Sequence, residues 1–534
     1  MNIDLEGAMA AWRSVLAEND LLFGATAEAE YGADTAATAA VVLAALRIRT
    51  SKQIPQVLKI AAAHRVPVYP ISTGKNWGYG GSRPARDGCV ILDLSALRTI
   101  IAFDATLGVV TVEPGVTQGM LAAFLEDGRH PFMVPVTGAG PNCSLVGNAL
   151  ERGFGITPYA DHFAAVTDVE AVLADGTVFK TALREIAGDD LASLFKWGVG
   201  PYTAGLFSQG GFGVVTRLSI ALARRPEAVM ACLFSLRDDS QLEAAVTSIQ
   251  NFLSIHHGVI GGINLMNQHR VLAMTAPYPA ALVDPDGLIP AEVIAAMGRR
   301  YRIHPWTGFA TIYGSRRVVA AVRKDFRDAL RGPAMRFFSV SPQRAKTLAK
   351  LAPWVPGQLG RQLGSTTRTL QGALDLALGR PNDTALPLAY WRNPVAYRGP
   401  ESDPARDGCG LIWYAPVIPM RAKPVRHYVE MMRRTMAEFR IEPLITLTSN
   451  GDRVFEGTTP LLFDRTDVAA AARAKRCYER LFTQGLSVGC APYRLPCDQF
   501  DLLTARQSSS SATARRLKFA LDPDGIISPG RYGL

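Results

Sequence analysis

The sequence predicts a multidomain protein in which helices alternate with strands, an α/β or α+β arrangement. Its 534 residues exceed one domain of ordinary size, ~100–200 residues, and predict two or three domains. Its 48% apolar and 19% charged residues are typical of folded domains and exclude wholesale disorder. Helix-like and strand-like segments also follow one another along the chain.

The N-terminal part shows this alternation most clearly. Apolar residues at helical spacing predict a helix over residues 52–65, and the apolar run at 66–72 predicts a short buried strand. A glycine-rich loop at 74–81 follows. The elements expected after it are strands at 89–94 and 108–116, a helix at 118–126, an irregular stretch at 130–162, a strand pair around 164–181 and a strand at 214–222.

The pattern changes near residue 227, where longer amphipathic helices begin. Helices are predicted at 238–254, 290–303 and 316–330, and a strand at 410–417. The serine-rich stretch 507–513 predicts a mobile loop. The last residues, 522–534, are rich in turn formers yet apolar, which predicts a buried, functional C-terminus.

The chain carries 57 Lys+Arg and 47 Asp+Glu, a formal net charge of +10. The basic residues are densest between Arg299 and Arg331, where Asp325 and Asp328 interrupt them. This mixture predicts a solvated, mildly basic face and no nucleic-acid partner.

Cysteine and histidine spacing predict reduced thiols and no metal site. None of the cysteines forms a C-x-x-C pair, and the eight histidines lack H-E-x-x-H spacing. The N-terminus resembles no secretory signal, and its longest uncharged stretch, 35–46, is shorter than the ~20 residues a membrane span needs. We therefore expect a cytoplasmic protein without a membrane partner. The seven cysteines are Cys89, Cys143, Cys232, Cys409, Cys477, Cys490 and Cys497.

The loop at 74–81 contains four glycines in eight residues. It lacks the Walker A pattern because Asn76 follows Lys75, and it precedes a strand, whereas the Rossmann fingerprint opens a helix. Successive amides in such a loop can converge on an anion such as a pyrophosphate. The alternative is a mobile surface turn, which Trp77 and Tyr79 within the loop count against.

The loop and further segments, in the same order, resemble the vanillyl-alcohol oxidase/p-cresol methylhydroxylase flavoproteins over nearly the whole chain. The resemblance implies an α+β, two-domain PCMH-type FAD-binding fold with an α/β cap over the flavin. It places the FAD-binding domain at 1–226, the cap/substrate domain at 227–490, and a C-terminal segment returning to the FAD domain at 491–534. The matching segments are STGKNWGYGGSRP (72–84), VEPGVT (112–117), GNALERGFGITPYADHF (147–163), GVGPYTAGLFSQGGFGVVT (198–216), Tyr493-Arg494 and DPDGIISPGRYG (522–533).

The resemblance also implies which residues bind FAD. The pyrophosphate would lie on the glycine loop, and small residues and main-chain groups elsewhere would line the rest of the cofactor. The implied cofactor-binding residues are Ser72, Thr73, Gly74, Lys75, Asn76, Trp77, Gly78, Gly80, Gly81, Pro114, Gly147, Asn148, Arg152, Gly153, Gly155, Gly211, Gly213, Val214, Val215 and Arg531.

The implied catalytic residues are Tyr79, Tyr493 and Arg494, which match the family's phenolate-binding positions. Their O–H and guanidinium donors would stabilise a para-substituted phenol as its phenolate, so that the ring expels a hydride to flavin N5. The implied function is FAD-dependent oxidation of a para-substituted phenol or related aromatic alcohol. The structural alternative makes Tyr79 a packing residue and Arg494 part of a salt bridge.

Two departures from the family leave other functions open. The stretch VPVTGAGPNC (134–143) contains no acid where the family oxidase has an aspartate, and Ile156 replaces a family tyrosine. The alternatives are oxidation of a non-phenolic alcohol or specialised metabolite, and a flavin-binding protein with a degenerate site.

The sequence favours non-covalent FAD. No histidine lies just before residues 411–416, where the family's oxidase branch has one, and Glu456-Gly457 replaces a paired His-His of the family. The electron acceptor would be oxygen or an electron-transfer protein, which the basic surface at 299–331 could dock, and the family implies a homodimer. Nearby nucleophiles that could attach the flavin are Tyr397, Cys409 and Tyr414; Trp391 and Trp413 could form cap walls or ordinary core.

Overall fold

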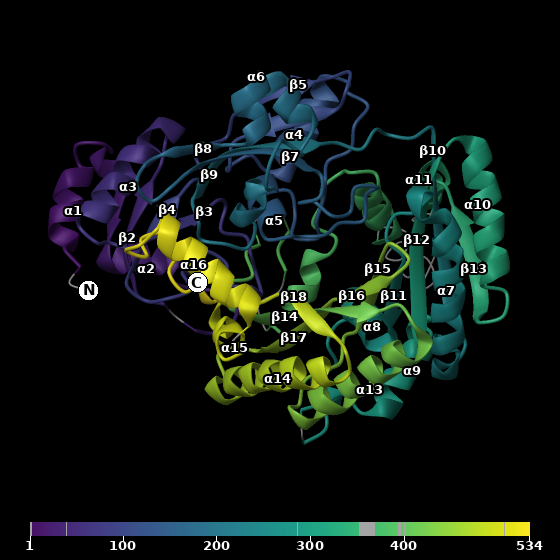
Figure 1. Cartoon of the computed structure of the whole chain (residues 1–534). Coiled ribbons are helices and arrows are strands. Elements are labelled where there is room, and N and C mark those ends of the chain that lie inside the picture. The colour runs from purple at the N-terminus through teal and green to yellow at the C-terminus, as the bar shows by residue number, and fades with distance from the viewer. Residues whose placement is uncertain are drawn as a thin grey trace. The chain divides into compact units, whose positions relative to one another are not determined.

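The computed structural model describes residues 3–38, 40–285, 287–351, 369–393, 397–399, 402–506 and 508–534. The chain divides into two compact units, which are described separately. Unit 1 comprises Met1–Phe154, Asp161–Arg224 and Leu495–Leu534, and unit 2 comprises Gly155–Ala160 and Arg225–Arg494. Figure 1 colours the chain from purple at the N-terminus to yellow at the C-terminus.

The first sheet of unit 1 has four strands in the order β1-β2-β4-β3. Strand β4 runs parallel to both of its neighbours and is buried along its whole length, as apolar parallel strands are. This confirms the strands predicted at 66–72 and 89–94; β3, expected to be buried, is buried at Val68 and Tyr69 and partly buried at Pro70 and Ile71. The strands are β1 (Leu21–Phe23), β2 (Val42–Arg47), β3 (Val68–Ile71) and β4 (Cys89–Asp93), and the helices beside them are α1 (Leu5–Trp12), α2 (Gly24–Tyr31) and α3 (Ile54–Ala63).

The second sheet of unit 1 is antiparallel, with the order β5-β6-β9-β7-β8. It includes the expected strand pair around 164–181. The sequence patterns missed β5, α5 and α6; α5 has only six residues, and Gly188 interrupts α6 with non-helical backbone angles. The elements are β5 (Ile100–Asp104), β6 (Val109–Val112), β7 (Val166–Val172), β8 (Val178–Lys180), β9 (Val214–Ala221), α4 (Gln118–Asp127), α5 (Leu145–Leu150) and α6 (Ala182–Leu194).

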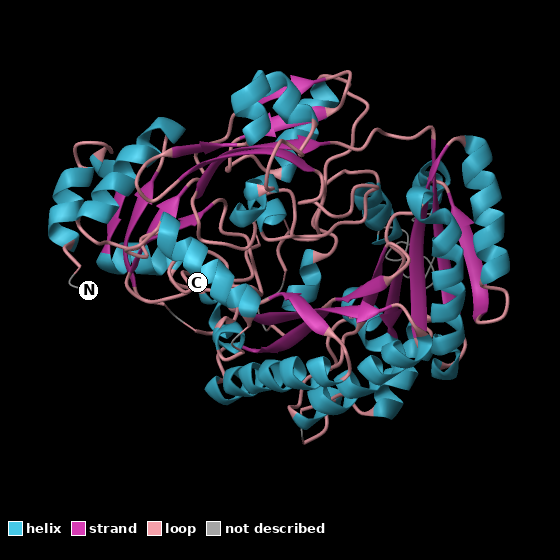
Figure 2. Ribbon diagram, viewed as in Figure 1, coloured by secondary structure: helices cyan, strands magenta, loops and turns pink. Residues whose placement is uncertain are grey.

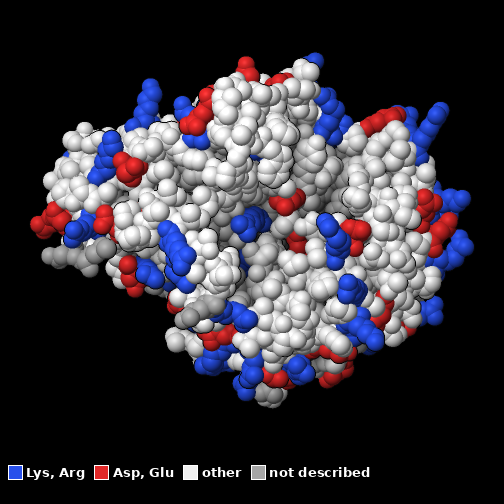
Figure 3. Space-filling view, viewed as in Figure 1, with Lys and Arg blue, Asp and Glu red and all other residues white. Residues whose placement is uncertain are grey.

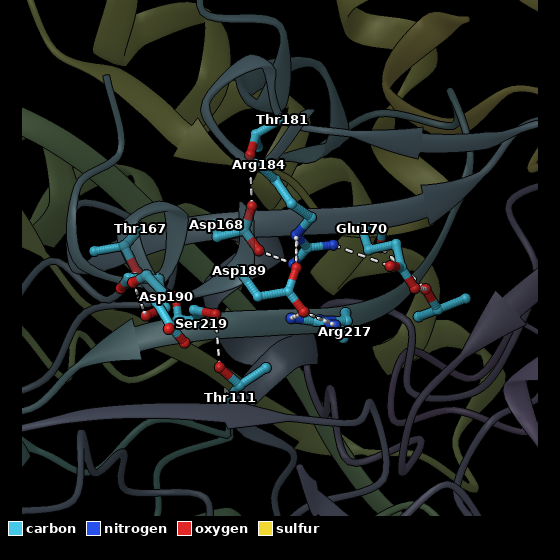
Figure 4. Close-up of polar contacts among 12 residues, drawn as sticks. Thr111, Thr167, Asp168, Glu170, Thr181, Arg184, Asp189, Asp190, Arg217 and Ser219 are labelled. Carbon is cyan, nitrogen blue, oxygen red and sulfur yellow. Dashed lines mark hydrogen bonds and ion pairs between the residues drawn. The ribbon is translucent and has the colours of Figure 1, made fainter. Parts of the chain in front are cut away.

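A cluster of ion pairs ties α6 to this sheet (Figure 4). Arg184 pairs with Asp168 and with Glu170, 2.9 Å away, on strand β7. Asp189 lies 3.2 Å from both Arg184 and Arg217. Because Arg184 is buried, these carboxylates compensate a charge that would otherwise be costly to desolvate.

The C-terminal segment of unit 1 corrects one expectation. The sequence predicts a mobile loop at 507–513. Residue 507 lies outside the described residues, but helix α16 (Ser509–Leu521) begins within 508–513, after the short helix α15 (Asp501–Thr504). The Ser508 hydroxyl accepts the backbone N–H of Ser511 at 3.1 Å, so the serines serve as a helix cap.

The residues after α16 confirm the prediction of a buried tail. Ile526 and Ile527 belong to the core that packs around β3 and β4. The N–H of Val68 donates to the Ile526 carbonyl, and the N–H of Ser528 donates to the Val68 carbonyl, each at 2.8 Å. The tail is therefore hydrogen-bonded to the strand that leads into the glycine loop.

Unit 2 is built on an antiparallel sheet with the order β13-β10-β12-β11-β15-β16-β14-β17, and β18 pairs with β14. Helices α7, α13 and α14 lie along one face of it (Figures 1 and 2). Its strands are β10 (Ala228–Leu236), β11 (Asn264–Asn267), β12 (Trp306–Gly314), β13 (Ala334–Val340), β14 (Cys409–Pro419), β15 (Thr446–Asn450), β16 (Val454–Gly457), β17 (Thr459–Asp464) and β18 (Ala491–Arg494). Its helices are α7 (Leu242–His256), α8 (Gln268–Thr275), α9 (Ala291–Tyr301), α10 (Arg316–Ala329), α11 (Pro342–Leu351), α13 (Ala422–Glu438) and α14 (Val468–Ser487).

All seven cysteines lie among the described residues, where they are free, as the spacing predicted; all of them are also buried. Within the same residues, none of the helices combines the length and apolar character needed to span a bilayer.

Candidate active site and cofactor site

The glycine loop of unit 1 has a backbone that other residues rarely adopt. Gly74, Gly78, Gly80 and Gly81 all have positive φ, between +58° and +126°. At Gly80 an added Cβ would strike the sulfur of Cys497. The C-terminal segment therefore lies directly on the loop and leaves room there only for glycine.

Some backbone N–H groups of the loop donate hydrogen bonds to protein oxygens, and others remain available. The N–H of Gly78 donates to Thr35 Oγ1 at 2.8 Å, and the N–H of Gly81 donates to the Asn76 carbonyl at 3.0 Å. In the part of the chain that the structure describes, no protein acceptor takes the amides of Thr73, Gly74 and Trp77. Such a run of available N–H groups suits an anion.

Helix α5 begins beside the loop. Its N-cap, Ser144, donates its backbone N–H to Thr73 Oγ1 at 3.2 Å and its hydroxyl to the Pro114 carbonyl at 2.6 Å. An added Cβ at Gly147 would strike Ser72 Oγ. The structure thus brings Ser72, Thr73, Pro114 and Gly147 together, and both the loop amides and the helix start favour a negative charge.

The residues after α5 fold back on the same helix. Asn148 hydrogen-bonds through its amide nitrogen to Nδ1 of the buried His162, a residue that the motif contains but that we did not single out. Burial lowers the pKa of His162 to about 4, so its ring is neutral near pH 7. The Arg152 guanidinium donates to Ser208 Oγ at 3.1 and 3.2 Å. Gly153 packs on the side chain of Asn148.

The C-terminal segment closes the other side of this region. Lys518 Nζ donates to the Gly211 carbonyl and to the Ile527 carbonyl, the latter at 2.7 Å. Arg531 donates to the Tyr69 hydroxyl at 2.7 Å and pairs with Glu151. Val214 and Val215 are buried beside Gly213, and Val214 belongs to the apolar core.

Gly155 is the exception among the expected cofactor residues. It belongs to unit 2, with the segment Gly155–Ala160, and its N–H donates to the Ala160 carbonyl at 2.9 Å. The other nineteen lie in unit 1. The available amides, the start of α5 and the close-packed glycines fit the pyrophosphate of a dinucleotide.

The expected catalytic residues are divided between the two units. Tyr79 belongs to the loop of unit 1, where its carbonyl accepts the N–H of Cys497 at 3.0 Å. In unit 2 Arg494 is buried and lies opposite Ala415 in the β14–β18 pair. A register shift between Ala415 and Pro416 leaves Tyr493 as the extra residue of β18.

The register of unit 2 defines one polar sheet face around Arg494, here called the arginine face. Cross-strand partners and alternate residues of a strand point to the same side. Trp413 and Val417 share this face with Ala415, and the partner chain Val417–Glu456–Thr448 extends it across β16 and β15. Tyr414 points to the opposite side, where its hydroxyl donates to the Leu481 carbonyl of α14 at 2.9 Å. The arginine face carries Trp413, Ala415, Val417, Thr446, Thr448, Glu456, Asn264, Met266 and Arg494.

Ile156, which replaces a family tyrosine, lies against the arginine face. Its carbonyl accepts the hydroxyl of Tyr313 at 3.2 Å. A side chain at Gly262 would come 3.1 Å from Thr448 Cγ2 and 3.8 Å from Ile156 Cγ2. An apolar side chain therefore stands where the family has a hydroxyl.

The nucleophiles near β14 make contacts within unit 2. Cys409 accepts a hydrogen bond from Asn393 at 2.9 Å, and burial raises the pKa of its thiol to about 11. The Tyr397 ring stacks edge-on against Tyr390, at 5.6 Å between ring centroids. The Trp391 indole donates to the Ala276 carbonyl at 3.0 Å within the unit 2 core, so only Trp413 of the two tryptophans lies on the arginine face.

Comparison with known proteins identifies the family. A family model described as an FAD binding domain matches residues 42–182. The chain is 27% identical over 499 residues to the 4-cresol dehydrogenase [hydroxylating] flavoprotein subunit of Pseudomonas putida, covering 92% of this chain and 88% of that protein. It is 34% identical over 530 residues to the 1'-carboxy-chondrochloren decarboxylase of Chondromyces crocatus, covering 99% and 97%. The chain belongs to the p-cresol methylhydroxylase-type family of FAD-linked oxidoreductases.

Solved structures of p-cresol methylhydroxylase-type flavoproteins share the whole fold. A p-cresol methylhydroxylase with substrate bound matches with a TM-score of 0.86 at 24% identity, covering 100% of this chain and 98% of that one. The 4-ethylphenol oxidase of Gulosibacter chungangensis matches with a TM-score of 0.87 at 23% identity and the same coverage. The expected family, two-domain α+β fold and FAD cofactor are confirmed, and the chain is an FAD-dependent oxidoreductase.

Proposed function

We propose that this FAD-dependent oxidoreductase oxidises a para-substituted phenol that is held as its phenolate by Tyr79, Tyr493 and Arg494. The observation that carries the proposal is the buried Arg494 on the arginine face, which also carries the aromatic side chain of Trp413. A buried cation at an aromatic wall suits an aromatic anion. Relatives named for 4-cresol and 4-ethylphenol support the same substrate class.

The domain roles belong to this proposal. Residues 1–226 with the C-terminal segment 491–534 bind FAD, and residues 227–490 cap the substrate. The division of the chain at 224/225 and 494/495 supports these limits, and the loop at 74–81 holds the pyrophosphate.

FAD, when bound, supplies the acceptor for a hydride at its N5 atom. The side chains of Arg494, Tyr79 and Tyr493 donate hydrogen bonds to the substrate oxygen and favour its ionised form. Electron density from the phenolate then makes the benzylic C–H bond a hydride donor, so no protein base is required at that carbon. The acid-free stretch 134–143 agrees with this.

A second candidate, oxidative decarboxylation, is favoured by the relative named a decarboxylase that matches 99% of the chain. Loss of a hydride from the benzylic carbon turns the phenolate into a neutral quinone methide. If the next carbon carries a carboxylate, the C–C bond to it breaks and CO2 leaves. Its electron pair forms the side-chain double bond and restores the phenolate, so the flavin takes up two electrons and the products are a vinylphenol and CO2.

Anaerobic flavin bleaching tests the proposal. We expect 4-ethylphenol to bleach the flavin, and Tyr493→Phe and Arg494→Gln to slow bleaching at least ~10-fold near pH 7. Because both variants lose phenolate stabilisation, their rates should recover as pH rises toward the ordinary phenol pKa of about 10. The control is Tyr301→Phe, which lies at the end of α9. If non-phenolic alcohols bleach the flavin faster than phenols, the protein oxidises a non-phenolic alcohol. If no substrate bleaches it, the protein is a flavin-binding protein with a degenerate site.

We also propose that oxygen or an acidic electron-transfer protein reoxidises the flavin, the latter by docking on α10. Basic residues here alternate with acidic ones, as at the right edge of Figure 3. Arg331 pairs with Asp328 at 2.8 Å, and His256 lies 3.3 Å from Asp325. These pairs leave a modest positive excess, so reoxidation by such a carrier should slow as ionic strength rises.

A further inference from the structure

Arg270 projects from the first turn of α8, directly after strand β11. Its backbone N–H donates to Asn267 Oδ1 at 3.0 Å. Asn267 is buried, and its side chain also donates to the Pro443 carbonyl at 2.6 Å. The start of the helix, and with it the Arg270 backbone, is therefore tied to the segment that leads into β15.

The Arg270 guanidinium reaches the arginine face. Its Nε donates to Thr446 Oγ1 at 3.1 Å, and its Cζ lies 5.9 Å from the centroid of the Trp413 ring. Its Nη1 is shielded from solvent and has no hydrogen-bond partner in the described part of the chain. Burial lowers the pKa of Arg270 to about 10, so the group is still cationic at neutral pH.

Another arginine of unit 2, in contrast, is paired with carboxylates. Arg426 is also half-buried, and Asp239 and Glu243 each lie 2.6 Å from its guanidinium. Among the described residues no carboxylate forms an ion pair with Arg270, and burial is the cause of its lowered pKa. A shielded cation without a counterion is costly, and such a group is explained by an anion that binds to it.

Arg270 and Arg494 are related through Trp413. Trp413 and Ala415 lie on one side of β14, Arg494 is the cross-strand partner of Ala415, and the Arg270 guanidinium lies near the Trp413 ring. Both cations therefore belong to the arginine face. An aromatic substrate lying along Trp413 would meet one cation at its phenolate and the other at its side chain.

We propose that Arg270 binds the carboxylate of the substrate, so that the enzyme takes a phenol whose para side chain ends in a carboxylate. This rests on the proposed phenol oxidation and narrows it to one class of substrate. Guanidinium matches a carboxylate in charge and in its paired donors, and Trp413 supplies the aromatic wall between the two anionic ends. Arg270 acts here as a specificity residue, remote from the carbon that loses the hydride.

The test compares two substrates that differ only in this charge: 3-(4-hydroxyphenyl)propanoate and its amide. Anaerobic flavin reduction is measured for wild type, Arg270→Gln, Arg270→Lys and the control Arg476→Gln, at an exposed position of α14. We expect Arg270→Gln to lower kcat/KM for the acid ~10–100-fold, mainly through KM, and to change the amide less than about 2-fold. Arg270→Lys should recover part of the loss, and Arg476→Gln should match wild type. Equal effects on acid and amide, or none on either, would overturn the proposal.

A second measurement separates this inference from the proposed function. Benzoate, a carboxylate that offers no hydride, is titrated into the holoenzymes and its Kd is read from the flavin absorbance. Arg270→Gln should weaken benzoate at least ~10-fold, while Arg494→Gln should weaken 4-ethylphenol instead. If no phenol reduces the flavin, the proposed function fails, and benzoate binding still decides the role of Arg270. If 4-ethylphenol reduces the flavin but benzoate binds wild type and Arg270→Gln alike, this inference alone fails.

Discussion

Cys497 donates its backbone N–H to the carbonyl of Tyr79 at 3.0 Å, and its sulfur occupies the space that a side chain at Gly80 would need. The two residues are more than four hundred positions apart in sequence, yet both belong to unit 1. The segment after residue 494 therefore completes the glycine loop, and perturbing either partner should affect FAD binding.

Gly80→Ala should weaken FAD binding at least ~10-fold, because the new Cβ would displace Cys497 and shift the loop amides. Flavin content, from the ratio of absorbance at 450 and 280 nm, measures the effect. Gly88→Ala is the matched control: Gly88 has φ +81°, so it shares the backbone strain, but no atom lies within 4 Å of the added Cβ. Full flavin content in Gly80→Ala would contradict a loop closed by Cys497.

Lys518→Met should destabilise unit 1 by about 3–5 kcal/mol, because it leaves the buried Asp522 carboxylate without its cation, 2.6 Å away. Two carbonyls that lie beside the expected FAD site, those of Gly211 and Ile527, also lose their donor. Urea unfolding measures the loss. Arg516→Met, at an exposed position of the same helix, should change stability little; an equal loss there would show that the helix surface, and not the buried ion pair, is responsible.

His162→Gln should make the free energy of unfolding less sensitive to a fall in pH below 7. The pKa of this histidine is about 4 when folded, against about 6.5 when unfolded, so below pH 6.5 the unfolded chain binds a proton that the folded chain does not. Wild type therefore loses up to about 3 kcal/mol relative to the variant between pH 7 and pH 4. Urea unfolding across this range measures the difference. His257→Gln, at an exposed position, is the control, and parallel pH curves for wild type and His162→Gln would contradict the prediction.

Acid precipitation of the purified protein should release FAD into the supernatant. The Cys409 thiol is held protonated by burial, and Tyr414 points to the helix side of the sheet, so neither is poised to form a bond to the flavin. The absorbance spectrum of the supernatant measures release. A yellow pellet would contradict non-covalent binding, and peptide mapping of the pellet would then show whether Tyr397 carries the flavin.

Local elements followed from the sequence where one physical signal dominated. The apolar runs at 66–72 and 89–94 became parallel strands, of which β4 is buried along its whole length and β3 in its first two residues. The loop predicted from the serine-rich stretch was wrong because serine favours both loops and helix caps. The residues that follow it form a helix, which Ser508 caps. Helix α6 was missed because Gly188 breaks its periodicity.

The sequence by itself determined the family and located the glycine loop, because both depend on short segments whose chemistry is local. Only the tertiary structure showed Cys497 on Gly80, or Arg270 beside Trp413 on the face of Arg494. These relationships join residues that are distant along the chain, and no periodicity or spacing records them. The absence of an ion-pair partner for Arg270 among the described residues is likewise visible only in the folded structure.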